Sequence, residues 1–379
     1  MTVPDVIQPA MDQAVRDGVF PGAVLVVRLS GNIRFLAVCG RLSAEPTSSP
    51  VQASTIYDLA SLTKPLVTVT LVLVLIQKGR LQLDVPIKSL LVELDRVPIG
   101  SASLRDLLTH STGLPGWRPF HERLEAKGIV PGGTDSDVRQ AVLECIREEP
   151  LIYERGEKSL YSDLGFMLLG FIVERVHGSH LDRSFEEIVA RPLQAKPLLF
   201  TPTVAASSRV DAPHIDRSMI APTEWEARRG RFLRGEVHDE NAAAMGGVAG
   251  HAGLFGTAEA ILAVSGAWLN AHHGRSSILD HKLVREFTRR QMQVPASSWA
   301  LGWDTPSAPS SSGRYLSPES FGHLGYTGTS LWIDPKRELE VVLLTNRVHL
   351  SRNNDAIRAF RPMIHDLVFQ ECVRLSGES

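Results

Sequence analysis

Apolar side chains recur at helical spacing at the start of the chain and at strand spacing soon after. Within residues 4–18, apolar positions fall at i, i+3, i+4, i+7 and i+8, which predicts a helix. Residues 23–29 and 33–38 are two apolar runs separated by Ser30-Gly31-Asn32, a combination typical of a β-hairpin. The first forty residues therefore predict one helix followed by two paired strands.

The middle of the chain is dominated by helical spacing. The most apolar stretch, residues 65–76, is rich in Val and Thr, so propensity favours a strand, whereas its length suits a buried helix. We predict a buried helix, with Pro65 in its first turn. Residues 201–240, in which Arg228, Arg229, Arg231 and Arg234 give local positive charge, predict a solvated loop. Further helices are expected at residues 104–109, 136–149, 164–176, 185–193 and 258–271.

The far end of the chain returns to strand spacing. Residues 327–333 and 339–345 predict two strands around a turn at 334–337, and 355–373 predict a helix that Pro362 kinks. Because neither terminal hairpin is stable alone, strands from the two ends must pair. We predict an α/β (α+β) fold in which both chain ends build a mixed antiparallel sheet, flanked by terminal helices, with an all-helical lobe inserted in the middle. The sheet lobe comprises residues 1–58 and 242–379 and the helical lobe residues 59–241, with a cleft between them.

Composition narrows the classes of partner. The net charge is −2, so no basic field predicts nucleic acid or an anionic membrane as a partner. Three distant cysteines predict buried thiols in a reducing compartment. No secretory pattern is visible at the N-terminus, and residues 65–76 are shorter than the ~20 residues that span a bilayer. We therefore expect a cytoplasmic protein without a membrane span, and no metal or organic cofactor. The oligomeric state is open.

A serine and a lysine three residues apart form the first candidate for chemistry. Ser61-Leu62-Thr63-Lys64 is the single Ser-x-x-Lys of the sequence. On a helix these two side chains share a face, and a neighbouring amine can activate a serine nucleophile. Such a pattern alone is more often a coincidence on the surface, so its interpretation depends on partners elsewhere in the chain.

Two further stretches supply candidate partners. Tyr161-Ser162-Asp163 precedes a predicted helix, and in an extended segment Tyr161 and Asp163 face the same side. The alternative is that Asp163 merely caps the helix. His323 lies among glycines at 322, 325 and 328, which allow a ligand to approach the backbone closely. A structural histidine is the alternative there.

Taken in order, these motifs resemble the serine β-lactamase and penicillin-binding protein superfamily. They are most similar to the branch of class C β-lactamases, D-alanyl-D-alanine carboxypeptidases and family VIII esterases. Ser61 to Lys64 resembles the Ser-x-x-Lys motif, Tyr161 to Asp163 the Tyr-x-Asn motif, and His323-Leu324-Gly325 the Lys/His-Thr-Gly strand. Residues 107–115 and the glycine-rich 246–255 are also similar to family stretches. The resemblance extends over residues 20–347 and implies the two-lobed fold predicted above.

The resemblance also implies a role for each residue. Ser61 would be the nucleophile that forms an acyl-enzyme, Lys64 would accept or relay its proton, and Tyr161 would be a general base whose pKa Lys64 lowers. The backbone N–H groups of Ser61 and Tyr326 would form the oxyanion hole. Asp163, where the family usually has Asn, would keep Lys64 charged.

The residues of the third motif indicate the class of substrate. His323 would take the place of the cationic or hydrogen-bonding residue, Gly325 would approach the substrate, and Leu324 lacks the hydroxyl of the usual Thr. These changes favour neutral esters or amides, so we predict a carboxylesterase-type hydrolase with weak β-lactam turnover. Alternatives are a β-lactamase or D-amino-acid-specific peptidase, or a weakly catalytic penicillin-recognising protein. The expected substrate is a small ester, β-lactam or peptide. Arg347 is interpreted as a surface arginine, and His238-Asp239 as part of a polar loop.

Overall fold

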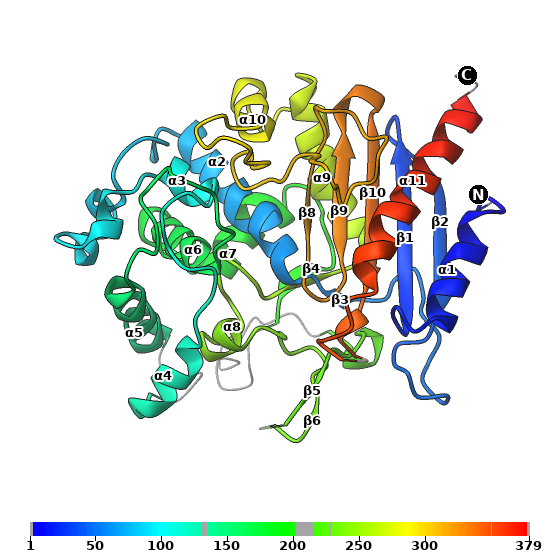
Figure 1. Cartoon of the computed structure of the whole chain (residues 1–379), viewed down its shortest axis with the longest axis horizontal. Helices are drawn as coiled ribbons and strands as arrows, with labels where there is room; N and C mark the ends of the chain where they lie inside the picture. The colour runs from blue at the N-terminus through cyan, green and yellow to red at the C-terminus, as the bar shows by residue number, and fades with distance from the viewer. Residues whose placement is uncertain (1–2, 130–134, 202–214, 228, 350, 377–379) are drawn as a thin grey trace.

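A five-stranded sheet joins the two ends of the chain (Figure 1). The computed structural model describes residues 3–129, 135–201, 215–227, 229–349 and 351–376. Along the sheet, Ala23 lies opposite Thr345 and Leu29 opposite Leu339, so the pairing of the two ends is confirmed. Every pair in this sheet is antiparallel. The strand order is β2 (Asn32–Gly40), β1 (Gly22–Leu29), β10 (Leu339–Thr345), β9 (Ser330–Asp334) and β8 (Phe321–Leu324).

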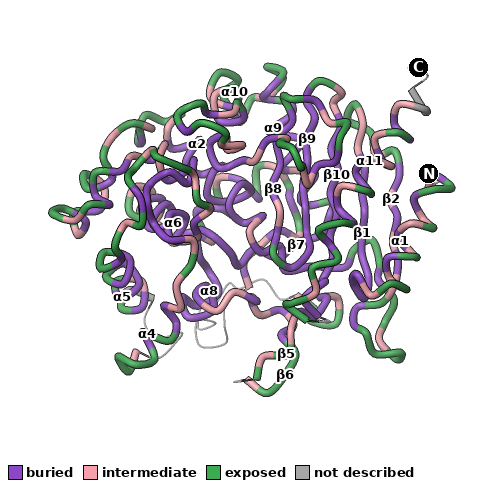
Figure 2. The backbone as a smooth tube through the Cα atoms, in the orientation of Figure 1, coloured by how far each residue is buried: buried purple, intermediate pink, exposed green. Residues whose placement is uncertain are grey.

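Helices cover both faces of the sheet, and β1 shows this most clearly. Leu25 and Val27 point into one core, which also holds residues of the terminal helices α1 (Ile7–Arg16) and α11 (Ile357–Ser376). Val24 and Val26 belong to the larger core on the opposite face, against α9 (Ala258–His272). The central strands are accordingly buried along their length (Figure 2). Burial on both faces explains why β1 is a continuous apolar run and does not alternate.

The remaining helices gather beyond β8, on the side away from the chain ends (Figure 1). The predicted boundaries at residues 58 and 241 stay a proposal. Two small sheets complete the fold, one of β3 (Tyr57–Asp58), β7 (Leu254–Gly256) and β4 (Leu198–Phe200), the other of β5 (Trp225–Glu226) and β6 (Arg231–Phe232). The helices are α2 (Thr70–Gln77), α3 (Leu104–Leu108), α4 (Phe120–Ala126), α5 (Asp135–Glu148), α6 (Asp163–His177), α7 (Leu181–Phe185), α8 (Glu240–Ala244) and α10 (His281–Thr288).

The ambiguous apolar stretch is a helix, as predicted. Residues 64–69 form π-helical turns that continue directly into α2. Among the described residues, the stretch Ala60–Gln77 is long and apolar enough to cross a membrane by length and composition, yet 83% of it is buried inside the fold. Burial on nearly all sides accounts for both its apolar character and its helical state, because a short strand could not fill that space.

Several elements differ from the prediction. The strand expected at 327–333 begins at Ser330, and residues before it form a turn that leads back to β8, which the pattern did not predict. Helix α10 was also missed, and the helix expected from residue 185 already begins at Leu181. Within 201–240 the described residues include the β5–β6 hairpin, whereas Arg228 lies outside the described residues. The three cysteines are free and buried, as expected.

Candidate active site

Ser61 lies in a single helical turn, Ala60–Leu62, between β3 and the buried helix. Ala60 has a left-handed φ of 46°, a conformation that costs a residue with a side chain roughly 1 kcal/mol or more. Asp58 holds this backbone in place, because its carboxylate accepts the Ala60 N–H at 2.9 Å and the His238 N–H at 2.7 Å. Burial raises the pKa of Asp58. Ser61 therefore lies in a constrained turn. Its backbone N–H is at the start of a helix and so has no hydrogen-bond partner within that helix.

The ammonium group of Lys64 has an acceptor for each of its three N–H donors. Its Nζ lies 2.7 Å from Asp163 Oδ1 and donates to Ser61 Oγ at 2.9 Å and to the carbonyl oxygen of His251 at 3.1 Å. The side chain is fully buried. Burial alone would lower the pKa of Lys64, but the charge of Asp163, together with hydrogen bonds to Asp163 and Tyr161, outweighs it and raises the pKa. Lys64 is therefore a cation at neutral pH.

Tyr161 stands beside Lys64, with its ring centroid 4.8 Å from Nζ. The prediction that Lys64 gives this phenol a low pKa is wrong. Burial raises the pKa of Tyr161 by more than Lys64, together with hydrogen bonds from Lys64 and Ser61, can lower it. The reason is that Lys64 shares its charge with Asp163, whose own negative charge raises the Tyr161 pKa further. Tyr161 is therefore a neutral phenol at pH 7.

Two aromatic residues that the sequence analysis did not single out hold Tyr161 in place. The ring of Trp299 stacks on Tyr161 at 5.7 Å, and the ring of His110 lies 4.8 Å away. His110 Nδ1 also accepts the backbone N–H of Ser162 at 3.1 Å, which fixes the Tyr161-to-Asp163 segment. His110 lies within residues 107–115, which resemble a family stretch, so the sequence could have indicated His110 as a site residue. Trp299 lies in no motif that the sequence revealed.

The histidine of the third motif lies on the opposite side of the cluster, on β8. His323 is buried, and its ring packs 5.9 Å from Tyr161. Nδ1 donates to the Leu324 carbonyl oxygen at 2.7 Å, and Nε2 has no hydrogen-bond partner among the residues that the structure describes. Burial, and then the charge of Lys64, lower the pKa of His323 to about 3. His323 is thus neutral and offers a lone pair, so of the two roles foreseen for it the cationic one is wrong.

The turn after β8 is fastened to the segment that carries Ser61. Thr327 Oγ1 donates to the Asp58 carbonyl oxygen at 2.7 Å. A Cβ atom at Gly325 would lie 2.0 Å from Thr329 Oγ1 and 2.6 Å from the Leu59 carbonyl oxygen, so glycine is required there. The Gly325 carbonyl oxygen accepts from the buried Arg361 at 2.8 Å. These contacts hold the Gly325–Tyr326 peptide beside the segment that carries Ser61.

Arg347 is not the surface arginine that the sequence suggested. It is 7% exposed, and its guanidinium donates to the carbonyl oxygens of Tyr326, Arg352 and Asn354 at 2.9, 2.8 and 2.6 Å. The same group lies 4.6 Å from the Tyr326 ring centroid. The donors of Arg347 are therefore directed at backbone carbonyl oxygens. Two of these belong to Arg352 and Asn354, which the chain brings back beside Arg347 after the end of β10.

The His238-Asp239 pair lies in a structured region. His238 Nε2 is 2.9 Å from Glu224, and Asp239 caps α8 and lies 2.9 Å from His251 Nε2. Although burial opposes ionisation of Asp239, the charge of His251 outweighs it and lowers the pKa. Because the His251 carbonyl accepts from Lys64, this pair helps to hold the lysine.

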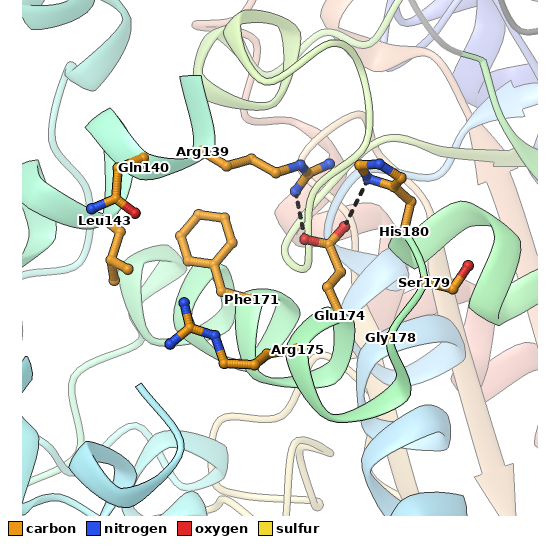
Figure 3. A pocket seen from close by; sticks show the side chains of 9 residues that line it. All are labelled: Arg139, Gln140, Leu143, Phe171, Glu174, Arg175, Gly178, Ser179 and His180. Atoms are coloured by element: carbon orange, nitrogen blue, oxygen red, sulfur yellow. Dashed lines mark ion pairs between the residues drawn. The ribbon is translucent and has the colours of Figure 1, made fainter. Parts of the chain in front are cut away.

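Other features do not overlap with this cluster. A cavity of about 350 Å³ lies between α5 and α6, where Arg139 and His180 face Glu174 (Figure 3). It is lined by none of the predicted site residues. Over the described part of the chain, no group of three or more His, Cys, Asp or Glu side chains could hold a metal ion. Ser61, Lys64, Tyr161, Asp163 and His323 thus form one cluster away from this cavity.

Comparisons with known proteins agree with this arrangement. Two putative D-alanyl-D-alanine carboxypeptidases, from Salmonella agona and Salmonella typhi, are each 33% identical to the chain, over 78% and 79% of its length and 70% and 72% of theirs. The hydrolase EstCE1, described as having promiscuous acyltransferase activity, has a TM-score of 0.71 at 20% identity, covering 94% of this chain and 97% of that one. A class C beta lactamase from Rhodobacter sphaeroides also has a TM-score of 0.71 at 20% identity, covering 96% and 100%. At such identities these two structures show the fold alone.

The family itself follows from the sequence match. The family model described as Beta-lactamase matches residues 5–361, nearly the whole chain. The curated relatives cover most of the same length. The chain belongs to the beta-lactamase family and is a serine hydrolase.

Proposed function

We propose that the chain is a carboxylesterase-type hydrolase that forms an acyl-enzyme on Ser61 and turns over β-lactams weakly. One observation carries this proposal: none of His323, Arg347 and Arg361 offers a free cation to a substrate. His323 is neutral, and both arginines donate to backbone carbonyls. A substrate carboxylate would lose its hydration there without gaining an ion pair, whereas a neutral ester would lose little.

The nucleophile is activated through Tyr161 in its neutral form. As Ser61 Oγ bonds to the ester carbon, its proton passes to the Tyr161 oxygen, and the Tyr161 proton passes to the departing alkoxide. The C–O bond then breaks and an alcohol leaves. Lys64 remains an ammonium and stabilises negative charge on Ser61 Oγ through the 2.9 Å contact. This relay needs no phenolate, which suits the raised pKa of Tyr161.

The acyl-enzyme is hydrolysed by the same relay in reverse. Water attacks the acyl carbon and passes one proton to Tyr161, while the Tyr161 proton returns to Ser61 Oγ. The bond between Oγ and the acyl carbon breaks, and a carboxylic acid leaves.

Backbone geometry supports an oxyanion hole at Ser61 and Tyr326. Arg361 Nη2 and the Gly328 N–H both donate to the Gly325 carbonyl oxygen, at 2.8 and 3.1 Å. In a trans peptide the Tyr326 N–H points away from that carbonyl, and a cation on the oxygen makes the N–H a stronger donor. The Thr327 hydrogen bond keeps this peptide beside the Ser61 turn. Such a donor typically contributes ~10²–10³ in rate.

A peptidase acting on D-alanyl-D-alanine is the second candidate, favoured by the names of the curated relatives. The class requires recognition of a terminal carboxylate, for which a cationic donor is the usual solution. The neutral His323 and the occupied Arg347 weigh against it here.

The prediction of a cytoplasmic location likewise stays a proposal.

Intact-mass measurement with a fluorophosphonate tests the acyl-enzyme. We expect one adduct on the wild type, none on Ser61→Ala, and an unchanged adduct on the control Ser89→Ala, which alters an exposed serine. In parallel, kcat/KM for a short p-nitrophenyl ester should exceed that for benzylpenicillin at least tenfold.

Three results would redirect the assignment. An adduct that persists in Ser61→Ala would exclude Ser61 as the nucleophile. A stable penicilloyl adduct without turnover of esters would indicate a penicillin-recognising protein. Release of D-alanine from a D-Ala-D-Ala peptide faster than hydrolysis of the ester would indicate the peptidase.

A further inference from the structure

A second cavity, remote from the Ser61 cluster, is lined mainly by basic side chains. It has a volume of about 580 Å³ and lies between α10, the end of α9 and residues 318–319, which precede β8. Six of its ten lining residues are basic. They are His272, His281, Lys282, Arg285, Arg289 and Arg290. Neither the proposed hydrolysis nor the family match gives this basic cavity a role.

Two of these cations project from one face of α10. Lys282 and Arg285 lie at i and i+3, so their side chains are neighbours, and Arg289 follows directly after the helix. The opposite face carries Val284 and Phe287, which are buried in the core. Like charges at this spacing repel. Packing of α10 through Val284 and Phe287 does not require these like charges, and their repulsion opposes folding.

The acidic residues of the cavity do not neutralise this charge. Glu286 is already shared between Arg105 and Arg289, at 2.9 and 2.6 Å. Glu319 is the other carboxylate in the lining. Four permanent cations thus face two carboxylates. Within the described residues, no ion pair is recorded for the side chains of Lys282 or Arg285, both of which are exposed.

A buried histidine in the lining supplies an independent indication of a ligand. His272 is 6% exposed, and its Nδ1 has no hydrogen-bond partner among the described residues. A buried polar atom left in this state destabilises the fold. Burial, followed by the charges of Arg285, His273 and His281, lowers the pKa of His272 to about 4, so the ring is neutral. The cavity thus combines unneutralised cations with a polar group that lacks a partner.

We propose that this basic cavity binds a small molecule that carries a phosphoryl group. Arginine side chains recognise phosphate oxygens through paired N–H donors, and a doubly charged phosphoryl group matches the excess of two positive charges. The volume is within the ~300–1,000 Å³ of small-molecule sites and exceeds what a lone phosphate fills. A phosphorylated nucleoside and a phosphorylated sugar share this chemistry.

Calorimetric titration of the full chain tests the proposal and separates those sources. The probes are inorganic pyrophosphate, ADP and glucose 6-phosphate, with adenosine and glucose as uncharged counterparts, in a phosphate-free buffer of low salt. At least one phosphorylated probe should bind below 1 mM and its uncharged counterpart should not. Lys282→Gln combined with Arg285→Gln should weaken that binding at least tenfold, and His272→Gln severalfold.

A matched control separates a site from general electrostatic attraction. Arg34→Gln combined with Lys127→Gln removes the same charge from exposed positions on β2 and after α4, and it should leave the affinity unchanged. Hydrolysis of the p-nitrophenyl ester by both double variants should stay at the wild-type rate, which shows that they are folded. Absence of binding by all three probes would overturn the proposal, as would equal losses in both double variants. Tighter binding of a short DNA duplex than of any probe would also overturn it.

Discussion

Burial has opposite effects on the basic groups at the two sides of the Ser61 cluster. On the helix side, Lys64 is charged, fully buried, and has an acceptor for each N–H donor. On the strand side, His323 is equally buried but neutral, with one nitrogen bonded to the Leu324 carbonyl and the other without a recorded partner. The same burial therefore yields a cation where a carboxylate is adjacent and a neutral ring where none is.

This difference assigns distinct tasks to the two sides. In the proposed mechanism the charge on the helix side would serve every substrate, because Lys64 and Asp163 lie beside Ser61. The strand side would contact the part of the substrate that varies, and its neutrality would select against carboxylates. Changes on the helix side should therefore alter the rate for all substrates, whereas changes on the strand side should alter preference among them.

Removing the charge on the helix side should have the largest effect. Lys64→Met keeps the length and apolar stem of the side chain but removes the ammonium. We expect kcat/KM to fall roughly 10³-fold for neutral and anionic esters alike, because the proton relay loses its charged partner. Steady-state assays on both substrates measure this, with Lys78→Met, an exposed lysine after α2, as the control. A loss confined to one substrate class would contradict the division of tasks.

Asp163→Asn should shift the pH dependence by removing the carboxylate that keeps Lys64 charged. Without it, burial dominates and the Lys64 pKa falls. Because activity requires the cation, the alkaline limb of the pH profile of kcat/KM should move to lower pH, by roughly 1–3 units. Activity near pH 10 then falls severalfold or more, while activity near pH 6 changes little.

The direction of that shift distinguishes two mechanisms. If neutral Lys64 were the base, Asp163→Asn would move the acid limb to lower pH and raise activity near neutrality. An unchanged profile would exclude a role for the Lys64–Asp163 pair in either mechanism. Glu122→Gln, which removes an exposed carboxylate from α4, is the control.

Adding a charge on the strand side should have the smallest effect and a selective one. His323→Lys places a cation where the neutral ring now lies. We expect the ratio of kcat/KM for a carboxylate-bearing ester to that for its neutral analogue to rise roughly fivefold, the value of one partly solvated ion pair. His323→Gln, which stays neutral, should leave the ratio unchanged. An equal rise in His323→Gln would mean that lost bulk, not charge, sets the preference.

The sequence was sufficient to locate the reacting groups but not their protonation. Ser61 and Lys64 meet because residues three apart share a helix face, and Asp163 joins them from the start of α6, as the motif spacing suggested. Their catalytic roles stay predictions. The predicted direction of the Tyr161 pKa shift was wrong. The shift depends on burial against Trp299 and His110, which come from distant parts of the chain.

The fold shows the same limit. Pairing of the chain ends was predictable, since two isolated hairpins with apolar faces need each other. Strand β8 was implied by the family resemblance alone, because Phe321-Gly322-His323-Leu324 has no strand pattern of its own and owes its strand conformation to pairing with β9. The burial of Arg347 was equally hidden, because it depends on the path of residues 351–354.

Synthesis of the chain exposes β1 long before its central partner exists. Leu29 pairs with Leu339, so about 310 residues must follow before β10 leaves the ribosome. At about 5–20 residues per second this takes roughly 15–60 s, during which an apolar strand has one unpaired edge. The nascent chain is thus open to capture by chaperones or by other strands throughout that interval. His323 lies on β8, which is held in the sheet through β9 and β10, so the Ser61 cluster can be completed only after these three strands have been made.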